Sequence, residues 1–558
     1  MKILEFIKIE LTLTGKKTVA LSFALILLMV SCNDILEETP VSLATASEHY
    51  ATAVGLADGL KAAYSPLRNF YGTQHALFLT VVGTDIITNG FGGDKNNPSF
   101  NNYDQNLLGS HSYFSSIWNP FYEGINQCNT IVNRAPNVGD MNEGEKSIAM
   151  GEARFLRALY YFHLVQQFGD VHFSLEETLG VETEATKTAV TTIYDQGIVP
   201  DLEYAVASLQ DQANDYGRAT KPAAQALLAR VQLTLGNWSA AETLANSVLA
   251  NTNFELVVPY SDLWKIDNDV NSEIIWSVQY TGDPLTNGSG NSAHLYFQFD
   301  YTKNPAMNRD VENGRPFQRF MPTNFFLELW DTSSDARWAG SVKTAWIANT
   351  TATINGQVVN PGDTAIKIVT HPVDDLEQSS APYWYIDYNN EDVSSQSNLL
   401  EIGGNSRRNF PVVKKFLDPL RSSINATDGR RDFPVIRLAE MYLIAAEAAF
   451  NQSKNDVAAG HINKLRERAV IPGKEAEMLV LASDMDLDFI LDERARELVG
   501  EMHRWYDLKR TGKLLERVRL HNIDAAANIK DMHLVRPFPQ TQIDRVTNPG
   551  DFLQNPGY

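Results

Sequence analysis

Cysteine is scarce in this sequence: 558 residues contain only Cys32 and Cys128. Two thiols exclude a disulfide-rich scaffold and a cysteine-rich zinc site. Basic residues are outnumbered as well, because 47 Lys and Arg face 68 Asp and Glu, which leaves a net charge of −21. A nucleic-acid-binding protein needs a basic face to meet phosphates, so this balance argues against nucleic acid as a partner.

The sequence also lacks the motifs of several common enzyme classes. It contains no Gly-x-Ser-x-Gly nucleophile elbow, no His-Glu-x-x-His zinc motif and no Gly-x4-Gly-Lys-Ser/Thr phosphate loop. The eleven histidines are scattered, and none lies in a group with metal-ligand spacing. His163, inside an expected helix, is more typical of a packed or surface residue than of a catalytic base. These absences favour a binding protein over an enzyme.

Only one long apolar run occurs, and it lies near the N-terminus. Lys16 and Lys17 precede the uncharged residues 18–31, a run shorter than the ~20 residues of a membrane span and typical of a secretory signal. The run closes with a small residue directly before Cys32, which resembles the bacterial lipobox, where the Cys becomes the lipidated first residue. The alternative is an ordinary signal peptide with an incidental Cys. The lipobox predicts a signal peptide at 1–31.

Two helix–turn–helix pairs of similar pattern occur far apart in the chain. The first spans residues 223–250 with a Gly-Asn break at 236–237, and the second consists of residues 439–450 and 456–469. Alanines in these segments allow two helices to approach closely, while large apolar residues fill the gap, which is typical of tetratricopeptide repeats (TPR). Such repeats stack into a curved scaffold and need about three units for stability.

Residues 251–431 have a different composition, rich in Asn, Gly, Asp, Thr and Pro. Short β-like runs occur at 273–278 and 357–359, separated by long stretches without regular periodicity. Long irregular loops within a folded chain are usually functional. We therefore predict a mainly α fold, in which a TPR-like helical repeat scaffold is interrupted by a loop-rich insertion with a few short strands.

The predicted organisation follows from these segments. After the signal peptide we expect a lipidated tether at residues 32–46 and a single domain at 47–558. The domain is expected to comprise a helical half (47–256), a loop-rich ligand-binding insertion (257–431) and a last helical repeat with the C-terminal region (432–558).

Several blocks distributed along the chain occur in a characteristic order. They are the lipobox with the acidic start after it, and residues 152–171, 217–221, 436–448, 493–510 and 537–558. In combination they resemble the SusD/RagB family of nutrient-binding lipoproteins from Bacteroidetes. One departure is Met502, where the family pattern usually has Gly, and we expect only a local helix adjustment there.

The resemblance implies a function at the cell surface. The protein is expected to capture oligosaccharides or polysaccharides and to deliver them, unchanged, to a SusC-like TonB-dependent transporter. It is expected to be anchored in the outer membrane through lipid on Cys32 and to have no nucleic-acid partner. A peptide or glycopeptide ligand on the same architecture is one alternative, and a repeat scaffold that docks proteins is another.

Glu493 and Glu497 stand four residues apart and therefore on one face of the expected helix. Paired carboxylates also serve acid–base catalysis in glycoside hydrolases, so a surface glycoside hydrolase is an alternative of another class. The neighbouring Arg494 and Arg496 favour a salt-bridge network that locks the scaffold. We interpret the pair as structural, and predict no enzyme activity and no cofactor.

A sugar ring offers one apolar C–H face and a rim of hydroxyls, so its site needs exposed aromatic rings beside polar side chains. Such side chains are expected on loops rather than on Ala-rich helices. Residues 85–103 and the insertion meet this requirement. The predicted ligand-binding residues are Asp85, Phe91, Asn96, Tyr103, Tyr296, Tyr301, Arg309, Trp338 and Trp384.

Charge refines this prediction in one respect. The strongly negative chain disfavours polyanionic glycans. A local basic patch near Arg309, Arg315 and Arg319 would offset that effect.

One acidic stretch has partial metal-ligand spacing. Asp267, Asp269 and Asn271 alternate as in a calcium-binding loop, but Ser272 replaces the turn glycine and Val278 stands where a bidentate Glu is required. The alternative is a polar loop before a strand. We predict no metal site and retain these three residues only as a weak calcium candidate.

Overall fold

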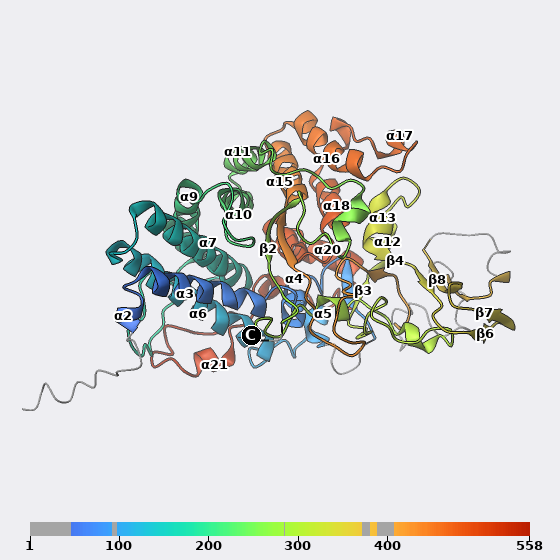
Figure 1. Ribbon diagram of the computed structural model, residues 1–558, viewed down its shortest axis with the longest axis horizontal. Helices are drawn as coiled ribbons and strands as arrows, with labels where there is room; N and C mark the ends of the chain where they lie inside the picture. The colour runs from blue at the N-terminus through green and yellow to red at the C-terminus, as the bar shows by residue number, and fades with distance from the viewer. Residues whose placement is uncertain (1–45, 92–96, 284, 371–379, 388–406) are drawn as a thin grey trace, which may run out of the picture.

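The computed structural model describes residues 46–91, 97–283, 285–370, 380–387 and 407–558. Helices dominate the fold, and small sheets gather mainly between residues 274 and 437 (Figure 1). This confirms the predicted mainly α, TPR-like fold. In this part of the chain no helix combines the length and apolar character needed to cross a membrane. Cys32 and the predicted signal peptide lie outside the described residues.

The two predicted helix pairs are present and lie against each other. The first consists of α10 (Lys221–Thr234) and α11 (Trp238–Leu249), and the second of α15 (Leu438–Asn451) and α16 (Asn455–Ala469). Helix α11 packs on α15 although about two hundred residues separate them in sequence (Figure 1). Glu242 fixes this contact by accepting hydrogen bonds from Gln452 (2.7 Å) and Lys454 (2.8 Å).

The remaining helices extend this scaffold on both sides. On the N-terminal side lie α2 (Ala46–His49), α3 (Ala53–Tyr64), α4 (Gln74–Thr80), α5 (Ser99–Asn102), α6 (Ser112–Arg134), α7 (Glu143–Phe168), α8 (Val190–Ile193) and α9 (Val199–Ser208). The others are α12 (Asn324–Glu328), α13 (Ala336–Ser341), α17 (Glu475–Met478), α18 (Leu487–Leu498), α19 (Arg504–Arg510), α20 (Leu514–His521) and α21 (Gln540–Ile543).

Helix α7 shows how local sequence sets the helix ends. Asn142 Oδ1 accepts the Glu145 N–H (3.0 Å) and Glu145 Oε2 accepts the Asn142 N–H (2.9 Å), which is a capping box. The helix ends at Gly169, with φ of 76° in the region that favours glycine. Between these ends most residues are buried, so α7 forms the centre of the N-terminal half. Cys128 of α6 is buried in this half.

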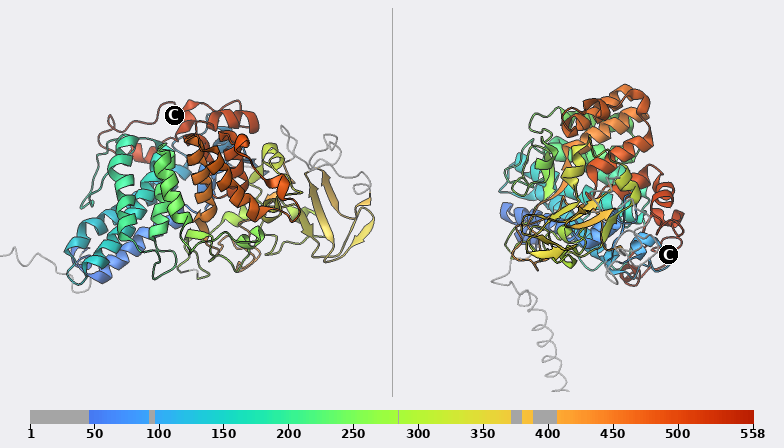
Figure 2. Two further views of the ribbon diagram at one scale, coloured as in Figure 1. Left: turned by 90° about the horizontal axis from the view of Figure 1, so that it is seen from above. Right: turned by 90° about the vertical axis from the view of Figure 1, so that its right-hand side faces the viewer.

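The strands form small sheets that connect distant segments. The antiparallel pairs are β1 (Ile87–Asn89) with β3 (Phe320–Pro322), β2 (Ile274–Val278) with β11 (Phe433–Arg437), β4 (Val342–Lys343) with β10 (Val412–Val413), and β6 (Ala352–Ile354) with β7 (Gln357–Val359). Strand β8 (Thr364–Val369) pairs antiparallel with β5 (Ala345–Ile347) and parallel with β9 (Trp384–Asp387). The predicted strands at 273–278 and 357–359 are thus confirmed as β2 and β7. Strands β5–β9 extend from one end of the body (Figure 2).

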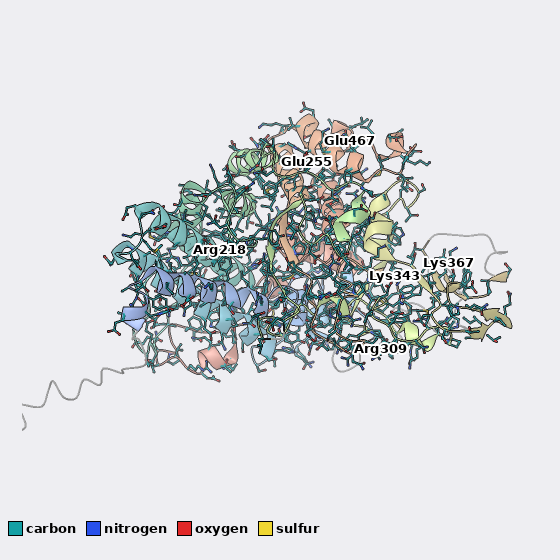
Figure 3. All side chains as sticks on the ribbon, in the orientation of Figure 1. Arg218, Glu255, Arg309, Lys343, Lys367 and Glu467 are labelled. Atoms are coloured by element: carbon teal, nitrogen blue, oxygen red, sulfur yellow. The ribbon has the colours of Figure 1, made fainter. Side chains whose placement is uncertain are left out.

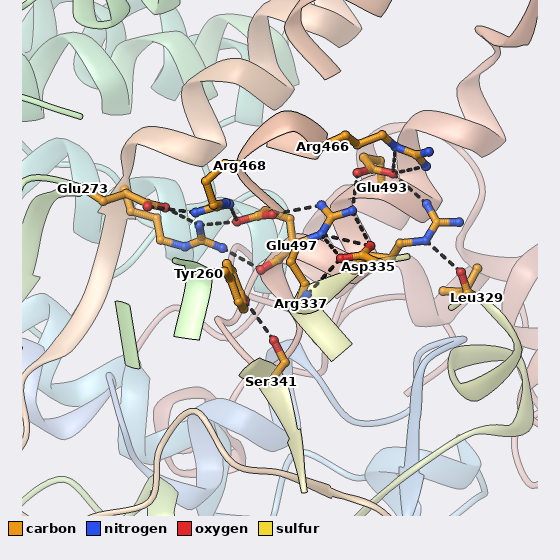
Figure 4. Close-up of polar contacts among 12 residues, drawn as sticks. Tyr260, Glu273, Leu329, Asp335, Arg337, Ser341, Arg466, Arg468, Glu493 and Glu497 are labelled. Atoms are coloured by element: carbon orange, nitrogen blue, oxygen red, sulfur yellow. Dashed lines mark hydrogen bonds and ion pairs between the residues drawn. The ribbon is translucent and has the colours of Figure 1, made fainter. Parts of the chain in front are cut away.

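A buried ionic network joins the insertion to the scaffold (Figure 4). Arg337 of α13 contacts Asp335 (2.7 Å), Glu493 (2.7 Å) and Glu497 (3.0 Å). Glu497 also receives Arg437 (2.7 Å) and Arg468 (2.6 Å). The structural interpretation of Glu493 and Glu497 fits these contacts, because both carboxylates are paired with guanidinium groups and have no exposed surface.

Met502 differs from the expectation drawn from the sequence. It lies in the turn between α18 and α19, outside any helix, with φ of 66° and a buried side chain. This left-handed conformation favours glycine, which explains why the family pattern has Gly at the position. The expected helix adjustment is wrong, because α18 has already ended at Leu498.

Candidate ligand-binding site

Three of the predicted ligand-binding residues are buried in the scaffold. Asp85 accepts hydrogen bonds from Arg504 (2.8 Å) and Arg517 (2.8 Å). Burial alone would raise the pKa of Asp85, but these two guanidinium groups outweigh it and lower the pKa. The hydroxyls of Tyr103 and Tyr301 donate to backbone carbonyls, at 2.9 and 2.7 Å. With exposures of 0 to 2%, these side chains offer a sugar no surface, which corrects the prediction for all three.

Tyr296 and Trp338 are also packed inward. The Tyr296 hydroxyl donates to Ser292 Oγ (2.7 Å), and Trp338 lies 5.7 Å from Trp330, measured between ring centroids. Only 5% of Tyr296 and 8% of Trp338 is exposed. Neither ring is a stacking platform in this structure, because its faces are covered by other side chains.

The other predicted residues retain accessible surface or lie outside the described residues. Arg309 is exposed, and Phe91 is half-buried with the Arg408 guanidinium 4.3 Å from its ring centroid. Trp384 is half-buried on β9, in the arm of small sheets. Asn96 lies outside the described residues. Ligand contact by these four residues stays a prediction.

Partly exposed aromatic and polar side chains meet where α4, α6 and the segment before β3 come together. We define the aromatic patch as His75, Asn97, His111, Tyr113 and Phe317, all of them half-buried. The Tyr113 ring centroid lies 4.6 Å from that of His111 and 5.9 Å from that of His75. Asn97 donates from Nδ2 to the Tyr113 hydroxyl (2.6 Å) and holds its Oδ1 3.2 Å from His111 Nε2.

Phe317 extends the aromatic patch toward the insertion. Its ring centroid lies 6.1 Å from that of Tyr296 and 5.6 Å from the guanidinium of Arg319. Arg319 is also near Tyr113, since it opposes the rise that burial produces in the pKa of that phenol. Arg319 therefore lies near both Phe317 and Tyr113, while Arg319 and Tyr296 are themselves buried.

The side chains of the aromatic patch are neutral at physiological pH. Burial lowers the pKa of His75 to about 4 and lowers that of His111 below its ordinary value. Burial raises the pKa of Tyr113, so the phenol keeps its proton. The patch therefore offers ring faces together with hydroxyl, amide and imidazole groups, a combination that suits the apolar face and hydroxyl rim of a sugar.

The sequence analysis missed most of the aromatic patch. His111 and Tyr113 stand at the start of a helix, whereas the search for exposed rings concentrated on long polar loops. A usable signal was present, because the Gly-Ser dipeptide before His111 indicates a chain entry into a helix, where side chains of the first turn remain accessible. The sequence also places Phe317 midway between Arg315 and Arg319, which is a second indication of a ligand-binding ring.

Two further hollows lie away from the aromatic patch. One has a volume of about 500 Å³ and lies between α6 and the segment 172–185, with Tyr122, Glu123 and Arg545 in its lining. The other, of about 260 Å³, lies beside the stacked rings of Phe325 and His521, whose centroids are 3.8 Å apart. Rings line both hollows: Trp118, Tyr122, Tyr161 and His172 the first, and Phe325 and His521 the second. The aromatic patch differs from both because its Phe317 ring adjoins the arginines of the insertion.

The weak calcium candidate is occupied by protein contacts. Asp269 Oδ1 accepts hydrogen bonds from Arg431 at 2.9 and 3.0 Å, and Asn271 Oδ1 accepts the Glu273 N–H at 2.9 Å. Within residues 46–91, 97–283, 285–370, 380–387 and 407–558, no three His, Cys, Asp or Glu side chains are grouped to hold a metal. The polar-loop alternative fits these contacts.

Comparison with known families agrees with this architecture. Residues 272–558, more than half of the chain, match the family model described as the SusD family. The chain belongs to the SusD family. Residues 72–233 match a second model, described as starch-binding and associating with the outer membrane. Members of the SusD family are non-catalytic glycan-binding proteins, which supports the prediction that this chain is not an enzyme.

Individual relatives cover nearly the whole chain. SusD-like protein P25 of Formosa agariphila is 28% identical over 545 residues, covering 95% of this chain and 97% of its own. The starch-binding protein SusD of Bacteroides thetaiotaomicron is 27% identical over 452 residues, or 75% of this chain and 74% of its own.

Solved structures share the fold. A laminarin-binding SusD-like protein aligns with a TM-score of 0.67 at 23% identity, covering 91% of this chain and 100% of its own. The surface glycan-binding protein A of Bacteroides thetaiotaomicron, in complex with laminarihexaose, aligns with a TM-score of 0.66 at 18% identity, covering 90% of this chain and 99% of its own. At these identities the likeness establishes the architecture alone.

Proposed function

We propose that this SusD family member binds an oligosaccharide at the aromatic patch, outside the cell, and passes it unchanged to a SusC-like TonB-dependent transporter. Lipid on Cys32 is proposed to hold the protein in the outer membrane, with the domain at 47–558 exposed at the surface. The family's association with the outer membrane supports this location.

The observation that carries the proposal is the composition of the aromatic patch. The half-buried rings of His75 and His111 lie 5.9 and 4.6 Å from the Tyr113 ring centroid, and the Asn97 side chain contacts both Tyr113 and His111. Phe317 lies beside this group, because Arg319 is near both its ring and Tyr113. A preformed set of ring faces binds a sugar at low entropic cost, because few side chains must be ordered.

The test is affinity electrophoresis in native gels that contain a panel of glycans, with Phe317→Ala as the main variant. Loss of one stacking face should weaken binding about 5- to 10-fold, which corresponds to roughly 1 to 1.4 kcal/mol. Phe489→Ala is the matched control, because Phe489 is also half-buried and also has a guanidinium near its ring, that of Arg466 at 5.2 Å. Equal retardation of both variants on every retained glycan would reject the patch as the site.

A peptide or glycopeptide ligand is distinguished in the same system. Peptides added to the gel buffer should leave glycan retardation unchanged if the aromatic patch accepts sugars only. Displacement by peptide, with no retardation by any glycan alone, would reassign the ligand class.

A further inference from the structure

Arginines near the aromatic patch differ from those of the scaffold in their partners. Scaffold arginines pair with carboxylates, as Arg157 does with Asp201 (2.8 Å) and Arg230 with Glu440 (2.7 Å). By contrast, Arg309 and Arg315 of the insertion form no ion pair with any described residue. Figure 3 shows Arg309 on the lower edge of the molecule, toward the arm.

The two unpaired guanidinium groups converge on one residue. Arg309 donates to the side-chain oxygen of Asn425 (2.9 Å), and Arg315 donates to the backbone carbonyl of the same residue (2.6 Å). Arg421 lies close by, since Arg315 adds to the lowering of its pKa that burial produces. Asp418 and Asp310 oppose that lowering at Arg421, so the positive field that attracts an anion comes from Arg309 and Arg315, which form no ion pair with a described residue.

Asp310 and Asp418, two acids that act on Arg421, are engaged in other contacts. Asp310 accepts hydrogen bonds from the Asn313 N–H (2.6 Å) and from the side chain of Asn349 (2.6 Å). Asp418 accepts the N–H groups of Leu420 (3.0 Å) and Arg430 (2.8 Å). These carboxylates shape the backbone of the insertion and do not form ion pairs with Arg309 or Arg315.

Phe317 brings this positive charge next to a stacking face. The Arg315 guanidinium lies 5.1 Å from the Phe317 ring centroid, so ring and cation face the same small volume. A sugar that stacks on Phe317 therefore places substituents on its rim beside Arg315. The planar fork of a guanidinium matches the two oxygens of a carboxylate or a sulfate ester.

We propose that the ligand is an acidic glycan, whose carboxylate or sulfate groups are bound by Arg309 and Arg315 while Phe317 covers an adjacent sugar face. The inference rests on the proposed function, because it assigns the charge of the ligand at the aromatic patch. It opposes the expectation from net charge, since −21 over the whole chain predicts avoidance of polyanions.

The experiment compares glycans that differ only in charge. The lipid-free chain from residue 33 onward is run in native gels that contain polygalacturonate or its methyl-esterified form, and dextran sulfate or dextran. We expect the charged member of at least one pair to retard the protein at least tenfold more strongly than its neutral partner. The pair that responds tells carboxylate from sulfate.

Variants then assign the effect to the two arginines. Arg309→Gln combined with Arg315→Gln should weaken retardation by the acidic glycan at least tenfold, and the single Arg309→Gln, an exposed site, should act in the same direction. Arg519→Gln is the matched control, because Arg519 is exposed, forms no ion pair with any described residue and donates to a backbone carbonyl, that of Ile529 at 3.1 Å, as Arg315 does. It should bind like the unmodified chain.

The outcomes separate this inference from the proposed function. Retardation by laminarin or other neutral glycans, but by neither acidic member, overturns the acidic-glycan inference and leaves the proposed function intact. Acidic retardation that the double variant and Arg519→Gln reduce equally also overturns it. Retardation by no glycan at all refutes the proposed function itself.

Discussion

Glu497 is the residue whose loss should most weaken the junction between scaffold and insertion. It has no exposed surface and accepts from Arg337 (3.0 Å), Arg437 (2.7 Å) and Arg468 (2.6 Å). The substitution Glu497→Gln keeps the shape and removes the charge. The connected network contains the cations Arg337, Arg437, Arg466, Arg468, Arg496 and Lys415, and the anions Glu273, Asp335, Glu493, Glu497 and Glu501.

The expected magnitude follows from burial. Removing one partner of a buried ion pair costs about 3–5 kcal/mol, because the remaining charges stay desolvated without compensation. The entropy of unfolding is about 2.1 cal/mol/K per residue, which gives roughly 1 kcal/mol/K for a domain of about 500 residues. Glu497→Gln should therefore lower Tm by about 3–5 °C.

Differential scanning calorimetry of the purified chain measures this shift. The matched control is Glu467→Gln, because Glu467 pairs with Lys464 at 2.9 Å while both side chains are more than half exposed. Solvent screens that pair, so its Tm should change by less than about 1 °C. Equal shifts in the two variants would refute the reasoning that burial, and not ion pairing as such, gives this network its effect.

Three further predictions concern pH, capping and anchoring. Burial would raise the pKa of Glu497, but Arg468, Arg437 and Arg337 outweigh it and lower the pKa well below 4.5. The contribution of this carboxylate to stability is therefore complete above about pH 4.5 and is lost progressively as the pH falls toward the lowered pKa. The Tm difference between the unmodified chain and Glu497→Gln should shrink from pH 7 to pH 3.5. Asn142→Ala should cost about 1 kcal/mol in urea unfolding by removing the side-chain acceptor of the α7 capping box, whereas Asn142→Asp keeps it. Cys32→Ser should abolish incorporation of labelled palmitate in cells and release the protein from membranes, while Cys128→Ala should change neither.

The helical pairs could be predicted from sequence because their signals are local. Alanine-rich segments broken by Gly236 or by the polar residues 451–455 specify two helices and a turn, whatever lies around them. The contact of α11 with α15 also follows from repeat stacking. By contrast, Met502 required knowledge of where α18 ends, and that depends on a turn set by tertiary packing.

The aromatic site could not be read from flanking residues. Tyr301 stands between Asp300 and Thr302, which suggested an exposed ring, yet its hydroxyl reaches the carbonyl of Gly314 and the ring is buried. Sequence neighbours report the polarity of a loop but not the direction of each side chain. The aromatic patch arises where α4, α6 and the segment before β3 converge, so its members share no common stretch of sequence.

The distribution of charge connects the scaffold to the proposed site. The network around Glu497 uses its arginines internally, whereas Arg309 and Arg315 form no ion pair with any described residue and donate hydrogen bonds to Asn425. A polyanion is therefore repelled by most of a surface that is strongly acidic overall, and is attracted within about one Debye length, ~8 Å at physiological salt, of these two side chains. Repulsion from the rest of the surface then limits an acidic glycan to the face that carries Arg309 and Arg315. The net negative charge and the local positive charge together orient the bound glycan.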